Sequence, residues 1–103
     1  MNPYIQNKMD ELNNLCLKRH VRRLALFGSA VADDFKPGES DIDMLVEFFP
    51  MTPVQRADNY LSLMVELQNL FGTDVDLLEP GPIRNPYFKK TLEDTKVIIY
   101  EAA

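Results

Sequence analysis

The sequence has very few of the residues that build disulfides or histidine-based sites in other protein classes. It contains one cysteine and one histidine among 103 residues. Because Cys16 stands alone, no disulfide can form within the chain, which is typical of proteins from a reducing compartment. His20 has no second histidine to act with, so the pattern favours a structural or surface role over that of a catalytic base or metal ligand.

Excess positive charge and long hydrophobic runs are also missing. Eleven lysine and arginine residues stand against sixteen acidic residues, which gives a net charge of -5. Binding along an extended nucleic acid needs clustered lysine and arginine to neutralise phosphates, so the composition argues against that function. No apolar run approaches the length of a membrane-spanning helix, and the N-terminal residues lack the basic and then apolar pattern of a secretory signal. We therefore expect a cytoplasmic protein without membrane attachment.

The remaining composition is typical of a folded protein. Hydrophobic residues make up 46% and charged residues 26% of the chain, and 103 residues suit one domain, without a separate lid or template-binding domain. We find no repeats, linkers or low-complexity segments. Helical and strand patterns alternate along the sequence, which predicts a single α/β (α+β) domain over residues 1–103. Strands are expected at Val21–Phe27, Ile42–Phe48, Thr73–Leu78 and Lys96–Tyr100.

Helix signals precede the first of these strands and separate the later ones. Asn2-Pro3 predicts the start of a first helix that ends near residues 18–23, and Asn85-Pro86 predicts a short helix through about Asp94. The segment Thr52-Pro53-Val54-Gln55 combines a capping threonine, a proline at the first helical position and a glutamine suited to a capping box. In the helix that follows, apolar residues recur at helical spacing up to Gly72, which predicts a core-facing side formed by Ala57, Leu61, Met64, Leu67 and Phe71.

The stretch from Ala25 to Phe48 carries the residues with chemical potential. Gly28 allows the backbone to bend closely around a ligand, and Ser29 offers a hydroxyl and an amide at a helix start, where phosphate binds readily. Asp41 and Asp43 are two positions apart at the entrance of a strand, so both carboxylates leave the same face. A phosphate-binding turn beside paired carboxylates indicates metal-assisted phosphate chemistry.

A later strand adds a third carboxylate. Asp74 and Asp76 share one face of the expected strand, so spacing alone leaves both as candidates. Three carboxylates beside a phosphate-binding turn can hold two divalent ions, which bridge nucleotide phosphates and lower the pKa of an attacking hydroxyl.

In this order the residues resemble the minimal nucleotidyltransferases of the DNA polymerase beta-like superfamily. The resemblance rests on LFGS ending at Ser29, SDIDMLVEF from Ser40 and VDLL from Val75, together with the C-terminal IRNPYFKKTLEDTKVIIYEA. It implies a mixed sheet of about four strands packed with about four helices.

The resemblance also implies roles for individual residues. Gly28 and Ser29 would hold the triphosphate, Asp41 and Asp43 would bind two Mg²⁺ ions, and Asp76, at the position that the family motif indicates, would bind the catalytic ion and help to activate the acceptor hydroxyl. Many relatives carry Arg-Gly shortly after the Gly-Ser, whereas this chain has Ala32-Asp33 there. Lys36, on the same loop, is the candidate to supply the missing positive charge to the nucleotide.

The implied partner is a protein. Many similar proteins are antitoxins of two-gene modules whose other product is a HEPN-type ribonuclease toxin, and they transfer AMP from ATP to a tyrosine of that toxin. Exposed apolar residues would be needed for the contact, and Tyr87, Phe88 and Phe48–Met51 are the candidates. Two alternatives remain open: an antitoxin that neutralises its partner by binding alone, and nucleotidyl transfer to a small molecule. The sequence leaves open whether the chain forms homo- or hetero-oligomers.

Overall fold

The computed structural model of the chain describes residues 3–31, 36 and 39–103. Within these residues it contains four α-helices, one short 3₁₀ helix and four strands. None of the described helices is both long enough and apolar enough to cross a membrane. The elements, in chain order, are α1 (Pro3–Gln6), α2 (Met9–Lys18), β1 (Val21–Phe27), η1 (Gly28–Val31), β2 (Ile42–Phe48), α3 (Pro53–Phe71), β3 (Val75–Leu78), α4 (Pro86–Thr95) and β4 (Val97–Glu101).

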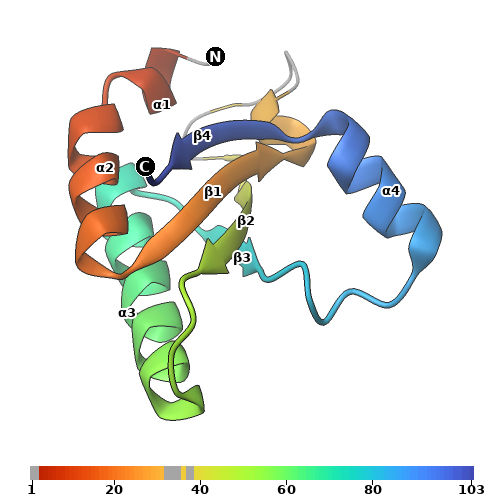
Figure 1. Cartoon of the computed structure of the whole chain (residues 1–103). Helices are drawn as coiled ribbons and strands as arrows, with labels where there is room; N and C mark the ends of the chain where they lie inside the picture. Colours follow the sequence, from red (N-terminus) through yellow and green to blue (C-terminus); the bar gives the residue numbers. More distant parts are fainter. Residues whose placement is uncertain (1–2, 32–35, 37–38) are drawn as a thin grey trace.

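The four strands form one mixed sheet in the order β3-β2-β1-β4. β1 pairs antiparallel with β2 and β4, whereas β2 and β3 are parallel. Figure 1 shows α2 and α3 side by side against the sheet, while α4 extends away from the body of the molecule. The expected α+β architecture with a mixed sheet is therefore confirmed, and the strand with Asp43 lies inside the sheet.

The two faces of the sheet bury different sets of side chains. The larger core fills the space between the sheet and the helices α2 and α3, and it includes Leu24, Met44 and Leu67. A smaller cluster on the other face joins Leu45 of β2 to Leu92 of α4. Because residues two apart on a strand share a face, Asp43 lies on the same side as Leu45 and faces away from α2 and α3.

The long helix α3 begins and ends where the sequence indicates. Thr52 and Gln55 form a reciprocal capping box, and Gly72 ends the helix in the left-handed conformation. The expected core-facing side is only partly correct: Leu67 and Phe71 are buried, whereas Leu61 is 57% exposed. Leu63 is fully buried and Tyr60 packs against the core, so the side of α3 that faces the sheet passes through these residues and Leu61 lies on the outward side.

Two other boundaries differ from expectation. The first helix is divided into α1 and α2 by a turn at residues 7–8, so that Ile5 is fully buried and the Tyr4 hydroxyl can donate to the carbonyl oxygen of Phe71. Asn2, its expected cap, lies outside the described residues. The third strand begins at Val75 rather than Thr73, and the last strand begins at Val97 rather than Lys96.

Candidate functional site

Three strand positions bring the candidate residues together at one end of the sheet. Phe27, the last residue of β1, pairs with Asp43 of β2. Asp43 pairs in turn with Asp76 of β3. Because paired residues lie side by side in neighbouring strands, the two carboxylates leave the same face of the sheet next to the turn that begins at Gly28. The parallel register therefore places Asp76, and not Asp74, directly beside Asp43.

Gly28 lies in contact with the Asp43 carboxylate. Its φ angle is +64°, a left-handed conformation that side-chain-bearing residues adopt only with strain. A Cβ atom at this position would lie 2.5 Å from Oδ2 of Asp43 and 3.4 Å from its Cγ. The absence of a side chain therefore allows the turn after β1 to pass directly over the carboxylate.

The electrostatic state of Asp43 reflects this crowding. Its pKa is raised above the ordinary value, first by burial, then by the charge and side-chain hydrogen bond of Asp76, and then by the charge of Asp41. Each of these causes disfavours the charged form of the carboxyl group. A divalent cation would reverse the effect of the two neighbouring charges, because it attracts the carboxylates that repel one another. The carboxylate oxygens are also the ligands that Mg²⁺ prefers, so the donor set fits this ion.

Burial of the Asp43 charge, together with this repulsion, predicts that Asp43→Asn stabilises the metal-free protein. Because the folded-state pKa of Asp43 is raised, protonation of its carboxyl group stabilises the folded state. This contribution to folding stability is complete below the ordinary pKa of 3.8 and is lost as the pH rises through the folded-state pKa. At neutral pH the charged carboxylate therefore costs stability, and the neutral amide avoids this cost. We expect the free energy of unfolding to rise by about 1 kcal/mol at pH 7, measured by chemical denaturation in the presence of a chelator.

The matched control is Asp58→Asn, which removes the same charge from an exposed position on α3. The gain from Asp43→Asn should disappear below pH 4, where both proteins carry a neutral group at position 43. A gain of the same size at pH 3 and pH 7, or an equal gain in Asp58→Asn, would contradict the burial and repulsion of the Asp43 charge as the cause.

The other candidate residues lie around the entrance of β2. The Ser29 hydroxyl donates to the backbone carbonyl of Asp41 over 3.5 Å, which joins the turn after β1 to this entrance. Lys36 is exposed and is joined to Ser40 by two hydrogen bonds: its N–H donates to the Ser40 hydroxyl over 3.1 Å, and its carbonyl accepts the Ser40 N–H over 2.8 Å. Residues 32–33, where the family resemblance leads us to expect a basic residue, lie outside the described part of the chain.

Asp74 has a different role in the structure. Its backbone carbonyl accepts the N–H of Ile42 over 3.0 Å and so joins the start of β3 to β2. Asp74 precedes the strand and is not among the groups that shift the pKa of Asp43. Within residues 3–31, 36 and 39–103, no three acidic, histidine or cysteine side chains are gathered closely enough to hold a metal ion by themselves.

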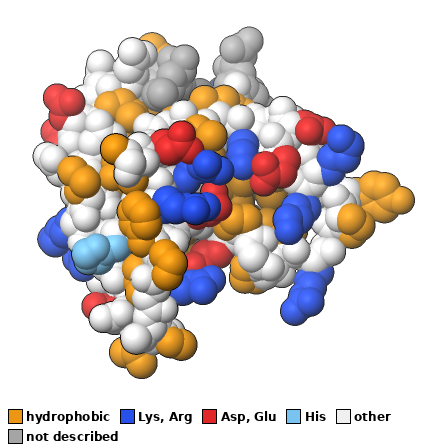
Figure 2. All heavy atoms as spheres, in the orientation of Figure 1, with side chains coloured by type: hydrophobic (Ala, Val, Ile, Leu, Met, Phe, Trp, Pro, Cys, Tyr) orange, Lys and Arg blue, Asp and Glu red, His pale blue; other side chains and the backbone are white. Residues whose placement is uncertain are grey.

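Charged and apolar surfaces lie away from the carboxylates. Arg23 bridges Glu47 and Glu101 across β2, β1 and β4, with nitrogen to oxygen distances of 3.5 and 2.7 Å. Figure 2 shows acidic and basic side chains intermixed across the middle of the molecule, with hydrophobic side chains at the far end of α4. On this helix Tyr87 is 83% and Phe88 43% exposed. Both candidates for a partner contact on α4 are therefore accessible.

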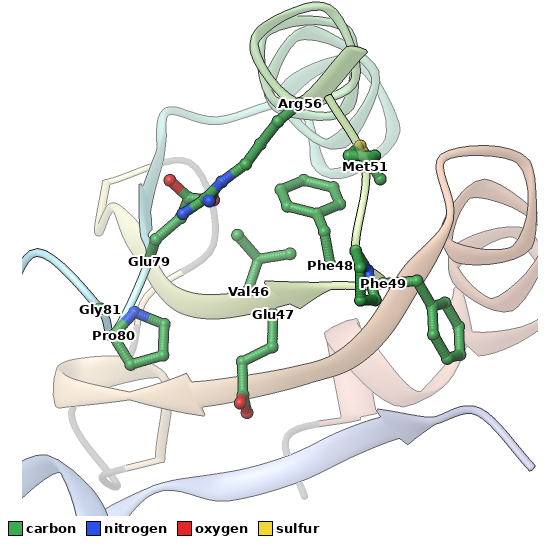
Figure 3. A pocket seen from close by; sticks show the side chains of 10 residues that line it. Val46, Glu47, Phe48, Phe49, Met51, Arg56, Glu79, Pro80 and Gly81 are labelled. Atoms are coloured by element: carbon green, nitrogen blue, oxygen red, sulfur yellow. Dashed lines mark hydrogen bonds and ion pairs between the residues drawn. The ribbon is translucent and has the colours of Figure 1, made fainter. Parts of the chain in front are cut away.

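A hollow of about 300 Å³ lies at the other end of β2 from Asp43. Figure 3 shows Val46 and Phe48 pointing from β2 toward α3, and Arg56 reaching toward Glu79. The Arg56 guanidinium Nε lies 2.8 Å from Glu79 Oε1. The segment Phe48–Met51 lines this hollow, so the second candidate for a partner contact borders a recess that is separate from the carboxylates.

Sequence patterns missed two residues that hold the strand of Asp76. The Tyr60 hydroxyl donates to the carbonyl of Leu77, and Gln68 Oε1 accepts the N–H of Val75 over 3.3 Å. Burial, followed by the charges of Glu79 and Asp76, raises the pKa of Tyr60, so its hydroxyl stays protonated at neutral pH. No motif marks these residues; the only available signal is that they are eight positions apart on one helix, close to a common face.

The same arrangement of sheet and helices occurs in known proteins. The family model of the nucleotidyltransferase domain matches residues 9–99 of this chain. The chain belongs to the nucleotidyltransferase domain family. The matched range includes the Gly28 turn and all the aspartates discussed above, and the family assignment confirms that this chain is a nucleotidyltransferase.

Individual relatives agree with the family assignment. A Methanocaldococcus jannaschii protein provisionally named a protein adenylyltransferase is 35% identical over 82 residues, which cover 80% of each chain. A structure provisionally described as a minimal nucleotidyltransferase superposes with a TM-score of 0.73 at 20% identity and covers 90% of both chains. The MNT antitoxin complex with a tri-AMPylated HEPN toxin from Shewanella oneidensis gives 0.61 at 17% identity, covering 94% of this chain and 72% of the other. The structural matches show that this fold is shared.

Proposed function

We propose that this nucleotidyltransferase transfers AMP from ATP, with Mg²⁺, to a tyrosine hydroxyl of a HEPN-type toxin and so acts as its antitoxin. The observation that carries the proposal is the pairing of Asp43 with Asp76 beside Gly28. This arrangement offers carboxylate oxygens for cations next to a backbone turn that passes close to them. The provisional name of the M. jannaschii relative and the tri-AMPylated toxin in the S. oneidensis complex support the choice of AMP and of a protein acceptor.

The proposed roles follow from the positions of the side chains. Asp41, Asp43 and Asp76 would hold the cations, with nucleotide phosphates completing the coordination, as is usual for Mg²⁺. When bound, Mg²⁺ neutralises phosphate charge and lowers the pKa of the attacking hydroxyl. Gly28 and Ser29 would bind the triphosphate through the backbone turn. Lys36, exposed and joined to Ser40, would supply positive charge from the loop.

The chemical step is an exchange of bonds at the α-phosphorus of ATP. The acceptor oxygen forms a bond to this phosphorus while the bond to the bridging oxygen of the β-phosphate breaks, and pyrophosphate leaves. The proton of the hydroxyl must be removed as the new bond forms. Asp76 lies on the edge strand and is exposed, so an acceptor can approach it from outside the sheet. We assign to Asp76 the orientation of that hydroxyl and the acceptance of its proton.

The experiment that tests the proposal compares two labels in ATP. The chain is incubated with Mg²⁺, the protein encoded by the adjacent gene, and ATP labelled at either the α- or the γ-phosphate. Transfer of AMP predicts that the partner retains only the α-label and that Asp41→Asn and Asp43→Asn abolish labelling. Label from the γ-phosphate, or no labelled protein at all, would contradict AMP transfer.

A binding-only antitoxin is the second candidate, and the exposed Tyr87 and Phe88 on α4 favour it. Hydrophobic side chains that stand free of the core are available to contact a partner without any chemistry. In cells that express the toxin, Asp43→Asn would then restore growth as well as the wild type does. If growth depends on Asp43 while the variant still binds the toxin, neutralisation requires transfer. Calorimetric titration with ATP and Mg²⁺ further separates AMP transfer from neutralisation by binding alone. Transfer requires the chain to bind the nucleotide, whereas neutralisation by binding does not.

A further inference from the structure

The strand that carries Asp76 is at the edge of the sheet. β3 pairs with β2 on one side, and no described strand pairs with its other side. In a parallel ladder, alternate residues direct their backbone groups toward the neighbouring strand. Because the Asp74 carbonyl accepts the Ile42 N–H, the backbone groups of Asp74 and Asp76 face β2. Those of Val75 and Leu77 therefore point outward, where an edge strand leaves its hydrogen-bonding groups unpaired.

Two side chains of α3 occupy this outer edge. Gln68 accepts the N–H of Val75 over 3.3 Å, and the Tyr60 hydroxyl donates to the carbonyl of Leu77. The strand residues that make these bonds immediately precede and follow Asp76 in the sequence. Both residues are partly buried, so water competes for the bonds less than it does at an open edge. The helix thus satisfies the backbone groups that a further strand would otherwise bind.

We propose that Tyr60 and Gln68 are positioning residues that hold Asp76 at the level of Asp43, an inference that rests on the proposed function. Asp76 is exposed, and among the described residues no hydrogen bond joins its carboxylate to α3. Its direction is therefore set by its strand, and a shift of that strand by one residue would turn it to the opposite face. Bonds on both sides of Asp76 oppose such a shift, because it would break both of them.

The decisive variants are Tyr60→Phe, Gln68→Leu and their combination. Tyr4→Phe is the matched control, because the Tyr4 hydroxyl also donates to a backbone carbonyl, that of Phe71, at the other end of α3. Groups that orient a metal ligand typically contribute ten- to a hundredfold to activity. We expect kcat for AMP transfer to fall about tenfold in Tyr60→Phe and about a hundredfold in the double variant, with the KM for ATP little changed.

A second readout needs neither metal nor nucleotide. Amide hydrogen exchange at Asp76 in the metal-free protein should be faster in Tyr60→Phe than in Tyr4→Phe at equal global stability. Equal exchange rates, or a fall in kcat no greater than that of Tyr4→Phe, would overturn the inference. Asp76→Asn in the AMP-transfer assay separates the role of Asp76 in transfer from the positioning role of Tyr60 and Gln68. If Asp76→Asn abolishes transfer while Tyr60→Phe behaves like the control, only the positioning role fails. If the wild type shows no transfer, the proposed function fails and exchange at Asp76 decides the inference.

Discussion

Asp76→Asn is expected to reduce AMP transfer about a thousandfold. The amide keeps the shape of the side chain but loses the negative charge that would bind the catalytic ion and accept a proton. A metal ion contributes several kcal/mol to such a transition state, and each 1.36 kcal/mol changes the rate tenfold. The measurement is the initial rate of label transfer from α-labelled ATP to the partner at saturating Mg²⁺.

Asp74→Asn provides the matched control two positions away. Asp74 is exposed, and its backbone carbonyl, which the substitution retains, makes the bond to Ile42. An exposed change of this kind alters free energies by no more than about 0.5 kcal/mol, so the rate should stay within about twofold of wild type. The reverse ranking, with Asp74→Asn inactive and Asp76→Asn active, would show that the pairing of Asp43 with Asp76 does not mark the third carboxylate.

Gly28→Ala is expected to lose both stability and activity. Its backbone has a φ angle of +64°, where an L-residue costs about 1–2 kcal/mol. In addition, the new Cβ would lie 2.5 Å from Oδ2 of Asp43, so the carboxylate or the turn must move. We expect the free energy of unfolding to fall by about 2 kcal/mol and transfer to fall about a hundredfold, because a small displacement of a reacting group has that effect.

The control for backbone strain is Gly72→Ala. Gly72 has almost the same φ angle, +65°, but the nearest atom to an added Cβ is the Tyr4 hydroxyl at 3.8 Å, an ordinary contact. This variant should lose stability by a similar backbone cost and keep its activity under conditions where it is folded. Equal activity losses in Gly28→Ala and Gly72→Ala would show that contact with Asp43 is not the cause.

Features set by neighbouring residues could be predicted from the sequence. The boundaries of α3 follow from a capping box at Thr52 and a glycine at position 72, both of which act within one turn of the helix. The Gly-Ser turn after β1 is equally local, since Gly28 has the positive φ that glycine readily adopts. These signals need no knowledge of the rest of the fold. They were sufficient to position β1, β2 and α3 to within a residue.

Features that depend on residues far apart in the sequence could not be predicted from these local signals. Alternation along a strand leaves Asp74 and Asp76 equivalent. The family motif indicates Asp76, and the parallel pairing of β2 with β3 places it beside Asp43. The role of Gln68 depends on the same pairing, because the outward direction of the Val75 N–H follows from it. Leu61 fits the periodicity of α3, but it is exposed because the sheet covers the side of the helix that carries Tyr60 and Leu63.

The most direct test of the central claim is the intact mass of the partner after co-expression in cells. The toxin is purified from cells that contain either the wild-type chain or Asp43→Asn, and the modified residue is identified by peptide fragmentation. We predict one or more added adenylyl groups on tyrosine with the wild type and none with the variant. A toxin that is neutralised by the wild-type chain yet carries no added mass would contradict AMP transfer and favour neutralisation by binding alone.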